Sequence, residues 1–228
     1  MTATQYDREL ENFGQTYDRA LNADIGRIKA AIAGACESSV IGIGSGGSFT
    51  AASLLCNLHE TYTGRVSRPS TPLEIICNPT LASVSPVFLV SAEGKNPDII
   101  EALQRARMHS ARPVHVITNR QKSPLTECAE KLTDVSMHVF ELTEKDGYLA
   151  TNSLLLDAAL IARAYGELDH EEGSMPASID ELRLGEQQIS DWLVYAEAFI
   201  EEVVRRGSII VTCYEAGLRR PSRFQEFL

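Results

Sequence analysis

Short strand-like runs alternate with helical runs through the middle of the chain. The gaps between the strand-like runs carry mostly helical patterns, and strands joined in this way form parallel sheets that are covered on both faces. The sequence therefore predicts an α/β three-layer sandwich with a five-stranded parallel sheet flanked by helices. The five strands are expected at residues 40–43, 73–77, 87–90, 114–118 and 135–142.

Helical patterns lie on both sides of this region. Residues 1–36 repeat apolar side chains at helical spacing, which predicts a helical segment broken near Gly14 or Asn22. The sheet is expected within residues 37–168. An acidic stretch with glycine and proline, at residues 167–178, marks the boundary after it.

The end of the chain predicts a second, shorter unit. Residues 169–207 are expected to form a linker and a connecting helix, which begins at a capping box made by Ser178 and Glu181. The apolar run SIIVTC predicts a strand, so that residues 208–228 would be the incomplete start of a second α/β unit.

The composition argues against several classes of protein. The 228 residues carry a formal net charge of -10 with scattered Lys and Arg, which argues against nucleic-acid binding. The apolar runs are shorter than the roughly 18 residues of a membrane span. The five cysteines are widely spaced and form no C-x-x-C pair, so we expect reduced thiols, no metal site and a cytoplasmic protein.

The stretch VIGIGSGGSFTAA joins the first expected strand to a helix. Gly42, Gly44 and Gly47 have the G-x-G-x-x-G spacing of dinucleotide-binding turns. Such a turn also needs an acidic residue at the end of the second strand, but the expected second strand has Glu74 at its beginning and Asn78 at its end. We therefore expect no cofactor. The loop suits a small anion such as a phosphate, or it is a tight turn without a ligand.

Three strand-loop-helix stretches follow one another in a recognisable order. They are IGIGSGGSFTAA, PVFLVSAEGKNPDIIEALQRAR and VHVITNRQKSPLTECAEKL. The first resembles the first strand and Gly/Ser turn of the sugar isomerase (SIS) domain family, whose members bind phosphosugars. The second is similar to that family's strand, S-x-S-G-x-T-x-D loop and helix, and the third to its strand, Thr-Asn pair and Ser-Pro helix start. The resemblance covers residues 25–166 well and implies a SIS or flavodoxin-like fold.

The resemblance also implies a set of ligand-binding residues. They lie in two loops, which are expected to face each other across the carboxyl edge of the sheet, and in a segment that corresponds to the family's G-V-A-S-T. The expected ligand is a phosphorylated or nucleotide-linked sugar. The residues are Gly44, Ser45, Gly46, Gly47, Ser48, Ser91, Glu93, Gly94, Lys95, Asn96 and Thr151.

The second loop departs from the family pattern at two positions. Glu93 stands in place of the second phosphate-binding serine, and Asn96 in place of the threonine. A carboxylate beside a phosphate repels it. Either a cation or Lys95 offsets Glu93, or Glu93 and Lys95 form a solvated pair, or this loop does not hold a phosphate.

The tail leaves two functions open. The family's aldose-ketose isomerases use a Lys-x-x-Glu helix whose glutamate moves protons, and Arg223 and Glu226 have that spacing here. Glu226 is thus a candidate catalytic base, or a solvated carboxylate near the chain end. The protein is accordingly a sugar-binding module, or a sugar-phosphate isomerase or deaminase. The lone strand SIIVTC and the apolar stripe of the preceding helix predict a homodimer.

Overall fold

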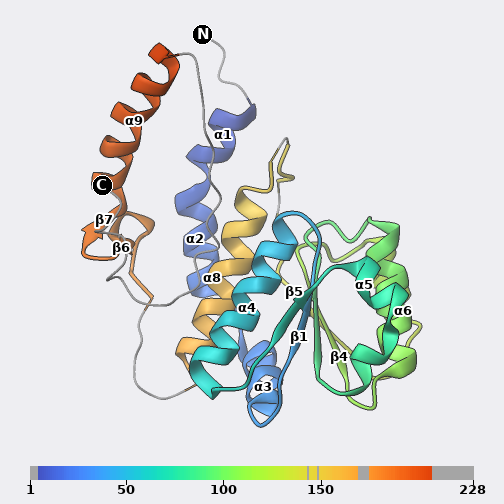
Figure 1. Cartoon of the computed structure of the whole chain (residues 1–228). Coiled ribbons are helices and arrows are strands. Elements are labelled where there is room, and N and C mark those ends of the chain that lie inside the picture. The colour runs from blue at the N-terminus through green and yellow to red at the C-terminus, as the bar shows by residue number, and fades with distance from the viewer. Residues whose placement is uncertain (1–4, 143, 148, 169–174, 207–228) are drawn as a thin grey trace. The chain divides into compact units, whose positions relative to one another are not determined.

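A computed structural model describes residues 5–142, 144–147, 149–168 and 175–206. The chain divides into two compact units, and the boundary between them in the sequence falls between Met175 and Pro176. The first unit contains a five-stranded parallel sheet in the order β2-β1-β3-β4-β5 (Figure 1). The strands are β1 (Ile41–Ile43), β2 (Arg68–Ser70), β3 (Val87–Val90), β4 (Val114–Thr118) and β5 (Val135–Val139).

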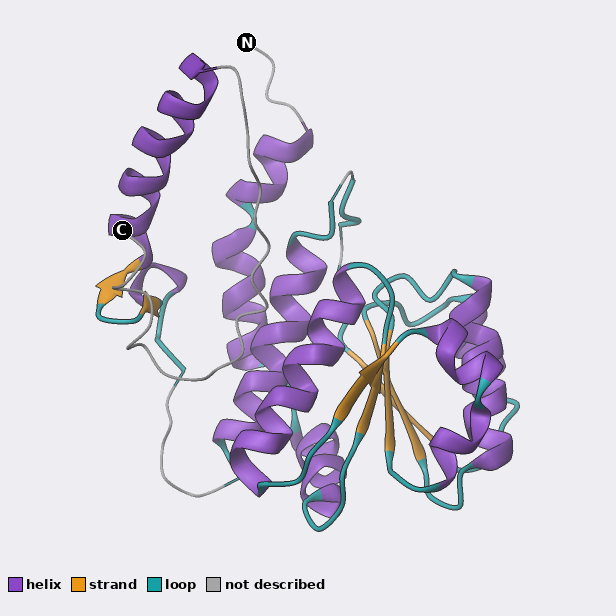
Figure 2. Cartoon of the chain, viewed as in Figure 1, coloured by secondary structure: helices purple, strands orange, loops and turns teal. Residues whose placement is uncertain are grey.

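Helices cover both faces of this sheet (Figure 2). One face carries α5 (Pro72–Cys77), the 3-10 helix η1 (Pro79–Ser83), α6 (Pro97–His109) and α7 (Pro124–Ala129). The other side has α4 (Gly47–Thr63) and α8 (Asn152–Gly166), with α1 (Gln5–Glu11), α2 (Phe13–Asn22) and α3 (Gly26–Ala35). The α/β three-layer sandwich with a five-stranded parallel sheet is thereby confirmed.

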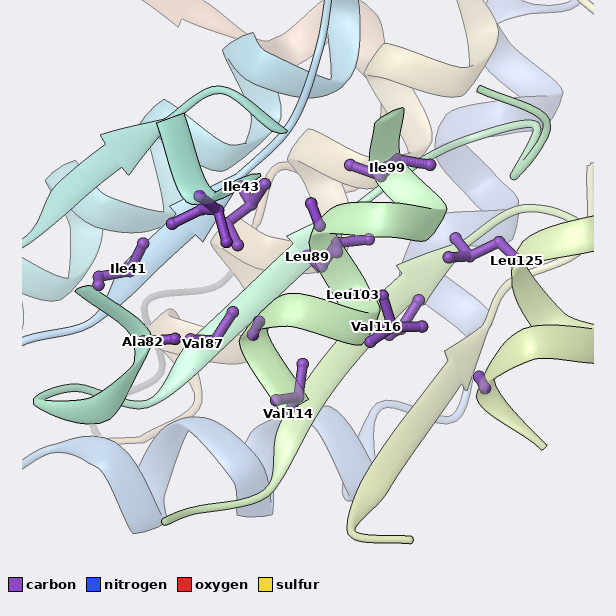
Figure 3. Packing of buried hydrophobic residues seen from close by; sticks show 14 residues of the cluster. Ile41, Ile43, Ala82, Val87, Leu89, Ile99, Leu103, Val114, Val116 and Leu125 are labelled. Atoms are coloured by element: carbon purple, nitrogen blue, oxygen red, sulfur yellow. The ribbon is translucent and has the colours of Figure 1, made fainter. Parts of the chain in front are cut away.

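The face that carries α6 holds a continuous apolar core. Alternate residues of β1, β3 and β4 point into it and meet the buried face of α6, as Figure 3 shows for Val116 and Leu103. β3 is buried along its whole length, as expected of a central strand covered on both faces. This core fixes the strands whose carboxyl ends carry the loops discussed below.

The second strand is not where the sequence predicted it. Residues 73–77 form the helix α5, because Thr71 and Glu74 make a capping box and Pro72 occupies the first turn. The Thr71 N–H donates to Glu74 Oε2 at 2.7 Å. The second strand is instead β2, an edge strand in which Pro69 is tolerated because one side of the strand has no partner among the described strands.

The expected helix from Ser178 also begins later. Ser178 caps a single 3-10 turn, η2 (Ile179–Glu181), and a hairpin of β6 (Arg183–Leu184) and β7 (Gln187–Gln188) follows. Gly185 turns this hairpin with a φ of 64°, a conformation that interrupts a helix. The helix α9 (Ile189–Arg206) starts only after it. The predicted strand SIIVTC and second α/β unit lie outside the described residues.

The N-terminal helical segment is broken, as predicted. α1 ends at Glu11, α2 ends at Asn22, and α3 starts at Gly26, so the first break lies slightly before Gly14. Within the described residues no helix combines the length and apolar character needed to cross a membrane.

Two buried histidines lie side by side on the sheet. His138 Nε2 of β5 is 3.3 Å from His115 Nδ1 of β4, and Phe88 stacks on His115 with ring centroids 4.8 Å apart. Among the described residues His138 Nδ1 has no hydrogen-bond partner. Burial, together with His115 and Arg27, lowers the pKa of His138 to about 4, and burial lowers the pKa of His115. His138 is buried and His115 is half-buried.

Candidate functional site

The candidate site lies where the strand order reverses. β1 has β2 on one side and β3 on the other, so the loops after β1 and β3 diverge at the carboxyl edge of the sheet. Ligands of open α/β sheets bind in the crevice at this point. The two loops meet there as predicted, because the Ala92 N–H donates to Ser48 Oγ at 3.3 Å.

The first loop brings backbone donors to the start of α4. Gly44 packs so closely under the helix that a Cβ on it would lie 2.3 Å from the Ser48 carbonyl oxygen. Gly46 has a φ of 57° and turns the chain into the helix, and no side chain caps the first turn. The first N–H groups of the helix therefore have no side-chain acceptor among the described residues, an arrangement that suits an anion.

The second loop is held by its own side chains. Ser91 Oγ accepts from the Gly94 N–H at 3.2 Å, and Gly94 has a φ of 62°. Asn96 Oδ1 accepts from the Asp98 N–H at 2.9 Å and so caps α6. The role of Asn96 in the structure is helix capping.

Arg120 is the cation that offsets the charge of Glu93, and phosphate binding by this loop stays a prediction. Arg120 Nε and Nη2 both donate to Glu93 Oε1, at 2.9 and 2.5 Å, and Lys95 Nζ lies 3.5 Å from Glu93 Oε2. Arg120 Nη1 also donates to the Leu142 carbonyl. Glu93 is therefore half-buried and paired, and the cluster of two cations and one carboxylate has a net positive charge.

Thr151 reaches the same edge but is already engaged. A Cβ on Gly47 would lie 2.5 Å from the Ala150 Cβ, so the segment before α8 packs on the start of α4. The Thr151 hydroxyl lies 3.0 Å from both Glu9 Oε2 and Asp146 Oδ1. These acceptors occupy the hydroxyl that the resemblance assigned to a ligand.

Asp146 places a carboxylate of the chain itself at the start of α8. It accepts from the backbone N–H groups of Thr151, Asn152 and Ser153 at 2.9–3.2 Å, and from the Ser153 hydroxyl. An anion at this position is favoured by the helix dipole and by the unpaired N–H groups. A carboxylate thus caps the start of α8, whereas no described side chain caps the start of α4.

A pocket of about 370 Å³ lies beside this region, between the start of the chain and the loop after β5. One side of the pocket is lined by Glu9 of α1, Asn12 between the two helices and Arg19 of α2. The other side is lined by Lys145 and Asp146. It does not include the Gly/Ser loop. The carboxyl edge at the loops after β1 and β3 is nevertheless the better candidate, because the first turn of α4 has no side-chain cap there among the described residues.

Sequence reasoning missed Arg120, Asp146 and Glu9. Arg120 follows β4 directly, so the rule that parallel strands end at one edge could have placed it beside Glu93. Asp146 and Glu9 had no such signal, since Glu9 contacts residues more than 130 positions away. Glu226 lies outside the described residues, and its role stays a prediction.

Glu74 also differs from its predicted position. It lies in the first turn of α5, just beyond the end of β2, where a dinucleotide fold places its ribose-binding acid. However, Arg68 Nη2 donates to Glu74 Oε1 at 2.8 Å, and the Thr71 N–H and Ser70 hydroxyl donate to Oε2. Both oxygens are engaged within the chain.

The sequence matches no protein-family model and no curated protein. Solved structures with the same fold include tagatose-6-phosphate ketose/aldose isomerase from Escherichia coli, with 17% identity over 72% of this chain and 48% of that one, and a TM-score of 0.58. An Escherichia coli CFT073 protein in complex with a sugar phosphate has 18% identity over 72% and 92% of the two chains, and a TM-score of 0.53. These neighbours are phosphosugar isomerase and SIS-domain proteins.

The first unit has the SIS-domain fold. A third neighbour of the first unit is glucosamine-6-phosphate deaminase from Thermotoga maritima, with 16% identity over 72% of this chain and 49% of that one, and a TM-score of 0.52. The chain thus spans about half the length of the Escherichia coli isomerase and of the deaminase. At these identities the likeness concerns the fold of the SIS domain alone.

Proposed function

We propose that the protein binds a phosphorylated sugar, or a nucleotide-linked one, at the carboxyl edge of its SIS domain. The observation that carries this proposal is the uncapped first turn of α4, which leaves backbone donors at the switch point of the sheet. Lys95 in the facing loop and Arg120 after β4 add two positive charges beside Glu93. Fold neighbours that are named for sugar phosphates or bind one support the ligand class.

We favour binding without turnover. The carboxylates of Glu93, Asp146 and Glu9 are all engaged by donors of the chain, which leaves them poorly placed to take a proton from a sugar carbon. The deaminase and isomerase among the neighbours keep a sugar-phosphate isomerase or deaminase, with Glu226 as its base, as the second candidate. Turnover of hexose phosphates by the purified chain would favour the second candidate.

Calorimetry with a hexose phosphate, the same hexose without phosphate, and NAD tests the proposed site. Binding of the phosphate ester alone is expected. Ser45 is exposed at the mouth of the loop, so Ser45→Asp should abolish binding by placing a carboxylate at the start of α4. Ser83→Asp makes the same charge change in η1, before β3 begins, and should bind normally. Binding of NAD alone would contradict the proposal.

Replacing Glu93 with serine is expected to tighten phosphate binding about fivefold, because the change removes one nearby negative charge and releases Arg120. The measurement is the dissociation constant for a hexose phosphate. Adding Arg120→Gln to this variant should remove the gain. An unchanged or weaker affinity in Glu93→Ser would mean that Glu93 is needed to hold Arg120 in position.

We further propose a cytoplasmic homodimer that associates through the region after Ser178. The described cysteines, Cys36, Cys56, Cys77 and Cys128, are free, which supports the compartment. Phe199 and Ile200 of α9 are 68% and 57% exposed, which supports an interface there. Light scattering is expected to give twice the mass of the 25.0 kDa chain, and Phe199→Glu to give a monomer. A wild-type monomer would contradict this.

A further inference from the structure

Asp157 and Asn119 form a buried pair directly beneath the carboxyl edge. Asp157 lies on α8 and is 1% exposed, and Asn119 follows β4 and is 2% exposed. Asn119 Nδ2 donates to Asp157 Oδ1 at 2.8 Å. Asn119 Oδ1 is also buried, yet it has no hydrogen-bond partner among the described residues. A buried amide oxygen without a donor is unfavourable and rare, so a donor is expected next to it.

The side chain that Asn119 is paired with can supply this donor in one of its two forms. An ionised carboxylate only accepts hydrogen bonds, whereas a neutral carboxylic acid carries one O–H. A side-chain amide and a neutral acid can exchange two hydrogen bonds, since each offers one donor and one acceptor. We infer that folded Asp157 keeps its proton well above the pH at which a solvated aspartate loses it, and donates its O–H to Asn119 Oδ1. The proton comes from solvent and no other bond changes.

The surroundings of Asp157 favour the neutral form. Complete burial raises its pKa to about 7, and the charge of Asp146 raises it as well, while the hydrogen bond from Asn119 acts in the opposite direction. The other titratable groups on the elements packed around α8 either interact with residues other than Asp157 or lie elsewhere in the core. They are Cys56 and His59 of α4, Tyr17 of α2, Arg27 and Lys29 of α3, Glu9 of α1, and His115 and His138 of the sheet.

The pair fastens three loops of the candidate site to α8. The Asn119 N–H donates to the Ala92 carbonyl at 3.1 Å, in the loop after β3, and the Leu142 N–H donates to the Asn119 carbonyl at 3.2 Å, after β5. The next residue, Arg120, binds Glu93. Asp157 is therefore a positioning residue for the site. Its protonation does not depend on the proposed sugar phosphate.

The test compares the wild-type chain with Asp157→Asn. An asparagine at this position has the same shape, can make both hydrogen bonds with Asn119, and does not titrate. Chemical denaturation of the full chain without ligand, from about pH 4 to about pH 8, measures the ratio of folded to unfolded protein.

The expected result follows from proton linkage. Unfolded Asp157 loses its proton near its ordinary pKa of 3.8 and folded Asp157 near 7, so the folded state binds more protons between these values. Relative to Asp157→Asn, the folded-to-unfolded ratio of the wild type should fall about tenfold for each unit by which the pH rises in this range. The total decrease should be roughly a thousandfold. Parallel curves for the two proteins would overturn the inference.

A second measurement needs no variant to fold. Carbon NMR of the wild-type chain, labelled at the aspartate carboxyl carbons, is expected to show one signal that titrates near pH 7. If every aspartate carboxyl titrates below about pH 5, Asp157 is ionised at neutral pH and the inference is wrong.

Ligand binding separates this inference from the proposed function. Wild-type affinity for a hexose phosphate should fall between about pH 6.5 and about pH 8, while Asp157→Asn keeps its affinity. Equal changes in both proteins would contradict the positioning role of Asp157. Absence of binding at every pH would contradict the proposed function and leave the titration result unchanged.

Discussion

Replacing Gly44 with alanine is expected to destabilise the first unit by about 3 kcal/mol or more and to remove the candidate site. The new Cβ would lie 2.3 Å from the Ser48 carbonyl oxygen and 2.7 Å from the Phe49 backbone nitrogen. Both atoms belong to the backbone of the first turn of α4, so no side chain can rotate away. The start of the helix would have to move, and its N–H groups with it.

Denaturation followed by circular dichroism measures the loss of stability, and calorimetry with a hexose phosphate measures the loss of the site. Gly34→Ala is the matched control. A Cβ at Gly34 meets no atom within 4 Å, and the residue lies within α3, so alanine should stabilise the chain by about 0.5 to 1 kcal/mol. A Gly44→Ala protein as stable as the wild type would show that the turn adapts.

His138 is expected to make the fold sensitive to acid by about 3 kcal/mol. Its pKa is 6.5 in the unfolded chain and about 4 in the folded one, so below pH 6.5 the unfolded state binds more protons. The stability contribution of the neutral ring is complete above pH 6.5 and is lost as the pH falls toward 4. His138→Leu should remove this loss, and it also removes a buried nitrogen that has no described partner.

The measurement has to be made against a variant, because Asp157 acts in the opposite direction over much of the same range. In the wild type, protonation of Asp157 stabilises the fold as the pH falls, while protonation of His138 destabilises it. The acid dependence of His138 should therefore be largest in Asp157→Asn and absent when His138→Leu is added. His109→Gln, in the exposed last turn of α6, is the control. If His138→Leu loses as much stability at low pH as the protein without this change, the lowered pKa of His138 is not the cause of the acid sensitivity.

Four of the five strands could be predicted. β1 and β3 are short continuous apolar runs, and β4 and β5 place apolar residues at alternating positions with His115, Ser136 and His138 between them. β2 could not be predicted, since its three residues are Arg68, Pro69 and Ser70, and an edge strand needs no apolar side chains on its open side. The strand was predicted instead at the neighbouring apolar run, residues 73–77. The signal that it is a helix was present, because Thr71 and Pro72 repeat the cap-proline device of Asn96 and Pro97.

The candidate site was predictable as far as it depends on strand ends. The loops at Ser48 and Ser91 follow strands that were recognised, and parallel strands bring such loops together. Only one of the two cations beside Glu93 was predicted from the sequence. Lys95 is two residues away in the chain, whereas Arg120 follows another strand. Asp157 gave no signal at all: its state depends on burial and on a missing donor, which only the folded arrangement reveals.

The contacts of Glu9 also bear on how the chain comes together during synthesis. Its carboxylate accepts from the Gly147 N–H at 2.6 Å, across 138 residues of sequence, and its carbonyl accepts from Asn152 Nδ2. At ribosomal speed the interval between the two ends of this contact is on the order of ten seconds. α1 therefore leaves the ribosome before the residues that anchor Glu9 have been made, and chaperones have that interval in which to meet it.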